Sequence, residues 1–299
     1  MIIIENPWES KESSYKGQLH CHTTNSDGAD SPTAVVTAYK NADYDFCSIT
    51  DHNYFTTDPS VSDILFIPGV EETYSWGHMT ATNVTAKASS TTPQEIIDDI
   101  IADGGIAGLA HPNYSVGWSW SQVFWQEGYS FCEIYNSLVD SFVGEEGYGE
   151  DKYDYLLSKG KPCWCVAVDD CHDISVSSVF DGGYVVVNSD TLTITAIKTS
   201  LSEGNFYAST GATISSISVS GNIISVTTAD SSTIKWIGFE EEELRSTSTS
   251  TSDSYTVTGR EKYVRIKITK DSDSTEAWSQ PLTVVQKKPL PEFRGEVVR

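Results

Sequence analysis

Short apolar runs alternate with amphipathic segments over the first two thirds of the chain. Runs that are apolar on both faces predict buried strands at 16–23, 44–50, 64–72, 77–84, 105–112, 130–136 and 162–170. Apolar residues at helical spacing predict helices at 31–42, 92–105 and 151–160, and a last one within 192–211. Buried strands that alternate with helices indicate a parallel sheet covered by helices. Seven such strands favour a closed (β/α) barrel, so the predicted class is α/β.

The pattern changes to period-two alternation, rich in Ser, Thr, Val and Ile, from about residue 213. Alternating runs predict a small antiparallel β module, similar to a sandwich, with strands at 213–229, 232–240, 254–259 and 262–270. The Glu run at 240–244 is expected to form a solvated turn and the Ser/Thr run at 246–254 a flexible loop. The predicted organisation is a barrel domain at 1–211, a small β-sandwich domain at 212–285 and a C-terminal tail at 286–299.

The net charge of −23 is concentrated in the first part of the chain. Up to Gly211 there are 30 acidic residues against 8 lysines, whereas the rest has 12 acidic against 11 basic residues. All five arginines lie in that second part. Because nucleic-acid binding needs a basic surface, this distribution argues against a nucleic-acid partner. The acidic residues either aid solubility or supply carboxylates to a site, and the composition leaves both readings open.

The six cysteines form no CxxC pair, and most of them lie within apolar runs. We expect buried, reduced thiols, which favour a reducing compartment. No run approaches the roughly 20 apolar residues needed to span a bilayer, and residues 1–14 lack the basic and hydrophobic segments of a signal peptide. The expectation is a cytoplasmic protein without a membrane partner, although a leader ahead of this sequence stays open. The sequence makes no prediction of the oligomeric state.

All the histidines lie in the predicted barrel domain, at or next to the ends of predicted strands. They are His20, His22, His52, His78, His111 and His172. Side chains alternate along a strand, so the first two share a face, as do Asp170 and His172. Parallel strands would bring these ends to one rim, together with Glu71 at the end of the third strand. Six imidazoles and several carboxylates on one rim predict a multinuclear metal site that suits Zn, Fe or Mn.

Seven short motifs, in their order along the chain, resemble those of the PHP (polymerase and histidinol phosphatase) family over about residues 16–211. They read HCHTTNSDG, ITDHN, GVEE, GHMTA, LAHPN, CEIYN and VDDCH. The resemblance implies a distorted seven-stranded (β/α) barrel that holds two or three Zn, Mn or Fe ions and hydrolyses phosphate esters. The ligand groups that it implies are His20, His22, Glu71 and Asp170 for a first ion, Glu71, His78 and His111 for a second, and Asp27, His52 and His172 for a third.

Several neighbouring residues have more than one interpretation. Asp169 stands where the family often has a small residue, but the D-x-H spacing selects Asp170 as the ligand. Asp51 precedes a predicted ligand and would point away from it, as a partner behind the ligands. Glu133 is either a group of the site or a strand-end carboxylate in solvent. Aromatic residues at 114–131 form either a lid or stacking wall over the site, or core packing.

The function that the resemblance implies is hydrolysis of a small-molecule phosphate ester, a nucleotide or similar phosphomonoester, by a hydroxide that bridges the metal ions. The catalytic candidates are Glu71, Asp170, His78 and His111. The two histidines could act as acids only if they are not ligands. The predicted barrel contains no arginine, so the phosphate would be oriented by metals, lysines, backbone N–H groups or neutral side chains such as Asn53, Tyr54, Asn113, Tyr114 and Asn136.

Two other functions remain open. A 3′–5′ exonuclease-type activity occurs in the same family, but the acidic barrel domain argues against it. The other is a non-enzymatic, metal-bearing protein whose β module binds a partner, because a fold alone assigns no function. Phosphate release from a panel of esters, and binding to single-stranded DNA, separate these hypotheses.

Overall fold

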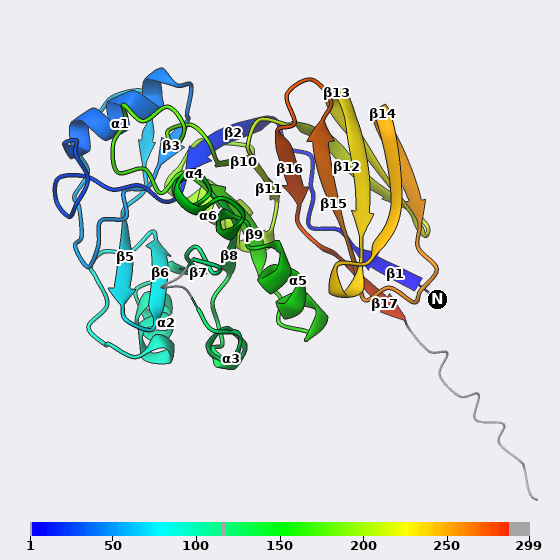
Figure 1. Ribbon diagram of the computed structural model, residues 1–299, viewed down its shortest axis with the longest axis horizontal. Coiled ribbons are helices and arrows are strands. Elements are labelled where there is room, and N and C mark those ends of the chain that lie inside the picture. Colours follow the sequence, from blue (N-terminus) through cyan, green and yellow to red (C-terminus); the bar gives the residue numbers. More distant parts are fainter. Residues whose placement is uncertain (1, 115–117, 287–299) are drawn as a thin grey trace, which may run out of the picture.

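The computed structural model describes residues 2–114 and 118–286, and all structural statements concern those residues. An α/β part that carries the helices α1 to α6 lies beside a part built almost entirely of strands (Figure 1). The predicted tail at 286–299 lies outside the described residues, apart from Gln286 at its start. None of the described helices is long and apolar enough to cross a membrane.

Capping residues set the ends of the helices that the sequence predicts. α1 (Pro32–Asn41) has Ser31 as its N-cap and a proline in its first turn. α6 (Ile194–Glu203) ends at Gly204, whose φ of 75° is the left-handed conformation that glycine adopts readily. The other helices are α2 (Pro93–Ala102), α3 (Trp120–Trp125), α4 (Ser137–Val143) and α5 (Glu150–Ser158).

The strands of the α/β part fall into two sheets, each with parallel and antiparallel pairs. The first sheet contains β2 (Ser13–Gln18), β3 (Phe46–Cys47), β4 (Leu65–Phe66), β10 (Tyr184–Ser189) and β11 (Phe206–Ser209). The second contains β5 (Gly69–Tyr74), β6 (Gly77–Thr82), β7 (Ile106–Leu109), β8 (Phe131–Asn136) and β9 (Trp164–Val168). Single bridges, Cys21 to Cys171 and His52 to Glu71, join the two sheets.

The mixed α/β class is as predicted, but the described strands do not show a closed seven-stranded barrel. The main departure from the predicted parallel order is β6, which pairs antiparallel with both β5 and β7. Only Ser75 and Trp76 separate β5 from β6, which is too short for a parallel crossover and sufficient for a hairpin. The hairpin places the start of β6 beside the end of β5. Barrel closure therefore stays a prediction.

The second part is an antiparallel β module, as its period-two pattern indicates. Its strands are β12 (Ile214–Ser220), β13 (Ile223–Ile237), β14 (Glu243–Thr256), β15 (Tyr263–Lys270), β16 (Glu276–Ser279) and β17 (Leu282–Gln286). They enclose a core that includes Ile234, Trp236 and Ile266. β1 (Ile2–Glu5) pairs with β17, and β11 of the α/β part pairs with β16. One sheet thus contains strands from both sides of the predicted boundary at residue 211, and the domain limits stay predictions.

The predicted flexible loop at 246–254 is wrong, because this segment belongs to strand β14. β14 pairs with β13 along most of its length, and most of its side chains are exposed. Alternating Ser and Thr side chains suit such a strand, since threonine is β-branched and small hydroxyls tolerate solvent on both faces. A low-complexity composition alone therefore could not distinguish loop from strand. Glu241 and Glu242 of the Glu run are exposed between β13 and β14, as predicted.

A buried ionic network joins the two parts of the molecule. Arg265 of β15 is fully buried; its Nε donates to Asp154 Oδ1 at 2.9 Å, and its Nη2 pairs with Asp154 Oδ2. Tyr263 Oη also donates to Asp154, at 3.0 Å, and Trp278 Nε1 donates to Glu150 Oε1 at 2.7 Å. Because both acidic residues lie on α5, the network fixes that helix against the β module.

Candidate metal centre

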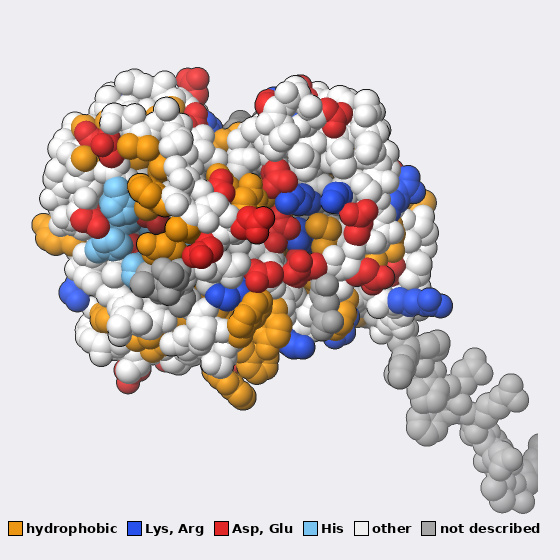
Figure 2. Space-filling view, viewed as in Figure 1, with side chains coloured by type: hydrophobic (Ala, Val, Ile, Leu, Met, Phe, Trp, Pro, Cys, Tyr) orange, Lys and Arg blue, Asp and Glu red, His pale blue; other side chains and the backbone are white. Residues whose placement is uncertain are grey.

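The nine predicted ligands lie together in the α/β part, although they come from distant segments. Figure 2 shows imidazoles gathered on one face of this part. Most of these residues follow strand ends, where side chains of neighbouring strands meet. His78 instead stands at the start of β6, and the β5–β6 hairpin brings it beside Glu71. The structure thus brings the predicted residues together, and their role as ligands is a proposal.

The first ligand group consists of His20, His22, Glu71 and Asp170. The Nε2 atoms of the two histidines lie 3.1 Å apart. Asp170 Oδ1 is 3.3 Å from His20 Nε2 and 3.0 Å from His22 Nε2. Glu71 Oε2 is 3.5 and 3.4 Å from the same two nitrogens. Four ligands about 2.0–2.1 Å from one tetrahedral zinc ion would lie about 3.3 Å apart, so this spacing fits a single divalent ion.

The second group uses the other carboxylate oxygen of Glu71. Its Oε1 is 3.0 Å from His78 Nδ1 and 3.2 Å from His111 Nε2. The rings of these histidines lie 4.9 Å apart and nearly perpendicular. Since each oxygen of Glu71 faces a different group, its carboxylate fits the bridging position that the resemblance implies.

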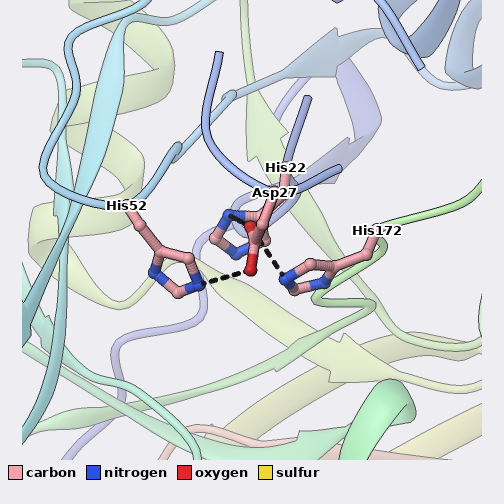
Figure 3. Close-up of side chains that lie close together, drawn as sticks. All are labelled: His22, Asp27, His52 and His172. Carbon is pink, nitrogen blue, oxygen red and sulfur yellow. Dashed lines mark ion pairs between the residues drawn. The ribbon is translucent and has the colours of Figure 1, made fainter. Parts of the chain in front are cut away.

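Figure 3 shows the third group, in which the Asp27 carboxylate lies between the rings of His52 and His172. Asp27 Oδ2 is 3.5 Å from His52 Nε2, and Asp27 Oδ1 is 3.3 Å from His172 Nε2. His22 also faces this group, with its Nδ1 3.9 Å from Asp27 Oδ1. The sequence prediction placed His22 in the first group alone. Residue spacing cannot show that one ring faces two groups, so the sequence did not predict that His22 also faces the third group.

Two carboxylate oxygens of the first group are buried without a hydrogen-bond partner, namely Glu71 Oε2 and Asp170 Oδ1. Glu71 Oε2 lies 2.7 Å from His52 Nδ1, but that nitrogen hydrogen-bonds Thr73 Oγ1 at 2.6 Å. A buried polar atom without a partner costs about 1–3 kcal/mol, and a buried charge costs more. A divalent ion would supply the missing partner. The imidazole and carboxylate donors suit Zn, Mn or Fe.

Asp51 lies behind the ligands, as predicted from its position before His52. Its carboxylate is fully buried and accepts hydrogen bonds from Thr23 N at 2.7 Å and Ser26 Oγ at 2.8 Å. These contacts hold the turn that carries Asp27. Asp51 therefore orients a ligand without facing the ligand groups itself.

The structure decides between the interpretations that the sequence gave for Asp169 and for Glu133. Asp169 accepts hydrogen bonds from Tyr39 Oη at 3.0 Å and from the backbone N–H groups of Gly182 and Gly183, both at 2.8 Å. These bonds turn it away from the ligands, and Asp170 is the carboxylate in the first group. Glu133 is 2% exposed, so the interpretation as a solvent carboxylate is wrong.

Core packing, one of the two predicted roles, holds for part of the aromatic stretch at 114–131, because Trp118, Tyr129 and Phe131 are buried in the hydrophobic core. Trp118 is buried, and its Nε1 donates to the backbone oxygen of His78 at 2.8 Å, so it packs behind the second group. Trp125 is 72% exposed on the surface. The ring of Tyr114 lies 5.6 Å from that of His111. Residues 115–117 lie outside the described residues, and so does that part of the predicted lid.

Two of the neutral side chains predicted to orient a phosphate are already engaged. Asn113 Nδ2 donates to the backbone oxygen of Tyr148 at 2.7 Å and to Asp151 Oδ1 at 2.6 Å. Asn53 Nδ2 donates to the backbone oxygen of Thr73 at 2.9 Å. These bonds fix loops beside the ligands. Both amide nitrogens are therefore less available to a phosphate, whereas Tyr54 is 50% exposed.

Burial and neighbouring charges oppose each other in setting the pKa values of the cluster. Burial alone would lower the pKa of His20, but the carboxylates of Asp170 and Glu133 help to raise it well above its ordinary value. Burial likewise opposes a charge on His111, yet Glu71 raises the pKa of that ring. Burial would raise the pKa of Glu71, but His20 and His111 hold it well below its usual range. Without metal, the neighbouring carboxylates therefore favour protonation of His20 and His111, whereas burial lowers the pKa of His22.

Metal binding is expected to release protons and to strengthen as the pH rises through the ordinary imidazole range and above it, because the pKa values of His20 and His111 are raised. An incoming ion must displace the protons that the carboxylates hold on His20 and His111, so acid competes with metal. Isothermal titration calorimetry in two buffers with different protonation enthalpies measures the protons released per ion. Equal heats in both buffers, or an affinity that does not change with pH, would contradict this arrangement of charges.

No protein-family model matches the chain, and no curated protein shows significant sequence similarity to it. Among solved structures, it is similar to the crystal structure of a two-domain protein containing a predicted PHP-like metal-dependent phosphoesterase from Bacteroides vulgatus ATCC 8482. The TM-score is 0.56 at 14% sequence identity, over 88% of this chain and 93% of that chain. The fold is PHP-like. At this identity the PHP-like similarity concerns the fold, and the activity has to be argued from the residues of the site.

Proposed function

We propose that the chain is a metal-dependent phosphoesterase that hydrolyses a phosphate ester of a small molecule. The observation that carries the proposal is the pair of adjoining ligand groups that share Glu71. Two neighbouring metal ions are typical of enzymes that cleave phosphate esters, because they hold the attacking and leaving oxygens together. The similar structure from Bacteroides vulgatus contains a predicted metal-dependent phosphoesterase, which agrees with this assignment.

The outer side of the centre is open to solvent, whereas its inner side is closed. The side chains of His20 and His22 are 0% exposed, while those of His52 and Asp27 are 24% and 56% exposed. A catalytic metal site needs an open position for water or substrate, and a purely structural one does not. A substrate would therefore approach from the side of the third group.

The residues of the centre would have different chemical roles. Ions held by these groups would supply a water that ionises near neutral pH and positive charge for the phosphate oxygens. Glu71 directs one oxygen to each of two groups and so sets their separation. His78 and His111 lie 3.0 and 3.2 Å from Glu71 Oε1, and we assign them to ligation and not to proton transfer. Burial of His20 and Glu71 excludes bulk water, which strengthens the electrostatic interactions around them.

A small phosphomonoester is favoured over a nucleic acid as the substrate. Figure 2 shows acidic side chains on the same face as the imidazoles, where they would repel a long polyanion. Arg265, which the β module could have contributed to a phosphate pocket, is instead buried against Asp154 and Glu150. A phosphate would then be held mainly by metal ions, which is sufficient for a compact monoester.

Metal-loaded protein is expected to release inorganic phosphate from at least one member of a panel of small phosphomonoesters, including nucleotides, and to leave single-stranded DNA intact. The panel is read by colorimetric phosphate detection after loading with Zn, Mn or Fe. Asp170→Asn serves as a matched negative control, because it retains the shape of the side chain and removes its charge. Absence of turnover across the panel, with metal bound and the fold intact, would contradict the proposal. It would favour a non-enzymatic binding protein. DNA degradation would instead support the exonuclease.

A further inference from the structure

Strand β8 contributes none of the nine predicted ligands, yet two of its side chains contact three of them. β8 lies between β7 and β9, the strands that lead to His111 and Asp170. The contacting residues are Glu133 and Asn136, which are 2% and 0% exposed. Because these polar side chains are buried, they do not serve solubility, and their hydrogen-bond partners indicate their role.

Glu133 joins the first and second ligand groups. Its Oε1 lies 2.6 Å from His20 Nδ1, so the opposite nitrogen, Nε2, faces the first group. Its Oε2 accepts a hydrogen bond from the backbone N–H of His111 at 2.7 Å. A hydrogen bond at one imidazole nitrogen fixes the ring orientation and the tautomer in which the other nitrogen can bind a metal. One carboxylate thereby orients a ligand of each group.

Asn136 extends this arrangement to Asp170. Its Nδ2 donates to Glu133 Oε2 at 2.9 Å and to Asp170 Oδ2 at 3.2 Å. Its Oδ1 accepts from Val139 N at 3.0 Å and caps helix α4, which settles the orientation of the amide. With Oδ2 engaged, Asp170 Oδ1 is the oxygen that faces the nitrogens of His20 and His22.

An irregularity in β8 allows both side chains to face the ligands. In a regular strand, residues three positions apart point to opposite faces. The register between β8 and β9 shifts between Glu133 and Tyr135, so that β8 carries one extra residue there. Such a β-bulge changes the alternation and re-aims the side chains that follow. It brings Glu133 and Asn136 to the same side.

Two of the oriented ligands have an unfavourable backbone conformation. The φ angles of His111 and Asp170 are 25° and 53°, in the left-handed region that side chains other than glycine rarely adopt. Such conformations persist only where surrounding contacts hold them, and they concentrate at functional sites. Glu133 accepts a hydrogen bond from the backbone of His111, and Asn136 donates one to Asp170, so these bonds help to hold both residues in place.

We propose that Glu133 and Asn136 are positioning residues that hold His20, His111 and Asp170 in the geometry that binds metal. The inference rests on the proposed metal centre and deepens it, since neither residue is itself a ligand. The sequence left open that Glu133 is a group of the site, but it could not show the contacts of Glu133 and Asn136 with the ligands, because these depend on the bulge.

Glu133→Gln is expected to weaken metal binding about 10–100-fold, the usual effect of losing a partner behind a metal ligand. The amide nitrogen that replaces one oxygen cannot accept a bond from His20 Nδ1 or His111 N. Metal affinity is measured by competition with a chelator, and the protonation of His20 Nδ1 and the orientation of its ring by ¹⁵N NMR of the zinc-loaded protein, in which the His20 tautomer is defined. Asn136→Asp, which replaces the donor by a carboxylate facing Glu133 and Asp170, is expected to act in the same direction.

Glu72→Gln is the matched control, because Glu72 is also a buried carboxylate that accepts a backbone N–H, from Ala88 at 2.6 Å. It is expected to leave metal affinity and the His20 tautomer unchanged. Affinity within twofold of wild type in both test variants would overturn the proposal, as would an equal loss in the control. A lower melting temperature with an unchanged tautomer and affinity would also overturn it. Since these readouts need no substrate, they remain informative even if the protein hydrolyses no phosphate ester.

Discussion

Glu71→Gln is expected to slow phosphate-ester hydrolysis about 1,000-fold or more and to lower the number of bound metal ions. The two oxygens of this carboxylate face different ligand groups, with Oε2 near His20 and His22 and Oε1 near His78 and His111. A neutral amide would weaken both groups at once. Loss of Lewis-acid stabilisation amounts to several kcal/mol of activation free energy, and each 1.36 kcal/mol is about a tenfold change in rate.

The neighbouring carboxylate provides the comparison for this variant. Glu72 is equally buried, but it bonds Ala88 N and takes part in none of the ligand groups. Steady-state kinetics and elemental analysis of both Glu→Gln variants, each checked by circular dichroism, separate a role in metal bridging from a general effect of neutralising a buried charge. Retention of full metal content and rate in Glu71→Gln would show that this carboxylate does not bridge ions.

Arg265→Met is expected to lower the free energy of unfolding by about 3–5 kcal/mol. The substitution leaves the buried Asp154 carboxylate with Tyr263 but without its cationic partner. Removing one member of a buried ion pair is costly because the remaining charge has lost both its hydration and its partner. The network joins α5 to β15, so the loss should also weaken the packing of the α/β part on the β module. Urea denaturation followed by tryptophan fluorescence measures the change.

An exposed ion pair provides the comparison for that experiment. Lys235 and Glu243 are 44% and 50% exposed and lie 3.3 Å apart, and exposed pairs contribute about 0–1 kcal/mol. Lys235→Met should therefore cost far less than Arg265→Met. The double variant Arg265→Met, Asp154→Leu is expected to recover much of the lost stability, because no unpaired charge remains. Equal costs for the two single variants would mean that the Arg265 network is not a stabilising junction.

The composition of the site could be predicted from the sequence because its signals are local. The HxH pair at His20 and His22, and the D-x-H spacing of Asp170 and His172, place ligand types at fixed offsets on a strand. The apolar runs around them predicted buried strands, and parallel order predicted that their ends meet. The structure brings these residues together, but its clusters of donor atoms divide them differently from the implied groups, since His52 lies with Glu71 and His78 as well as with Asp27. The ligand groups stay predictions.

The features that the sequence missed depend on contacts between distant segments. His78 reaches Glu71 through an antiparallel hairpin, whereas the prediction assumed parallel strands throughout. Glu133 and Asn136 reach the ligands because of a bulge in β8. The bulge is defined by the pairing of β8 with β9, which lies some thirty residues away along the chain. The Ser/Thr run became strand β14 because β13 pairs with it, and not because of its own hydrophobic pattern. In each case tertiary pairing determined the outcome.

We propose that imidazoles and carboxylates from separate strands bind adjoining divalent ions. X-ray fluorescence combined with anomalous diffraction from crystals of the purified protein tests it directly, since it identifies the metal and locates it. We expect two or three ions per chain, with one between His20, His22, Glu71 and Asp170 and another at the remaining oxygen of Glu71. No anomalous signal among these residues after loading with Zn, Mn and Fe, or ions bound only elsewhere, would contradict it.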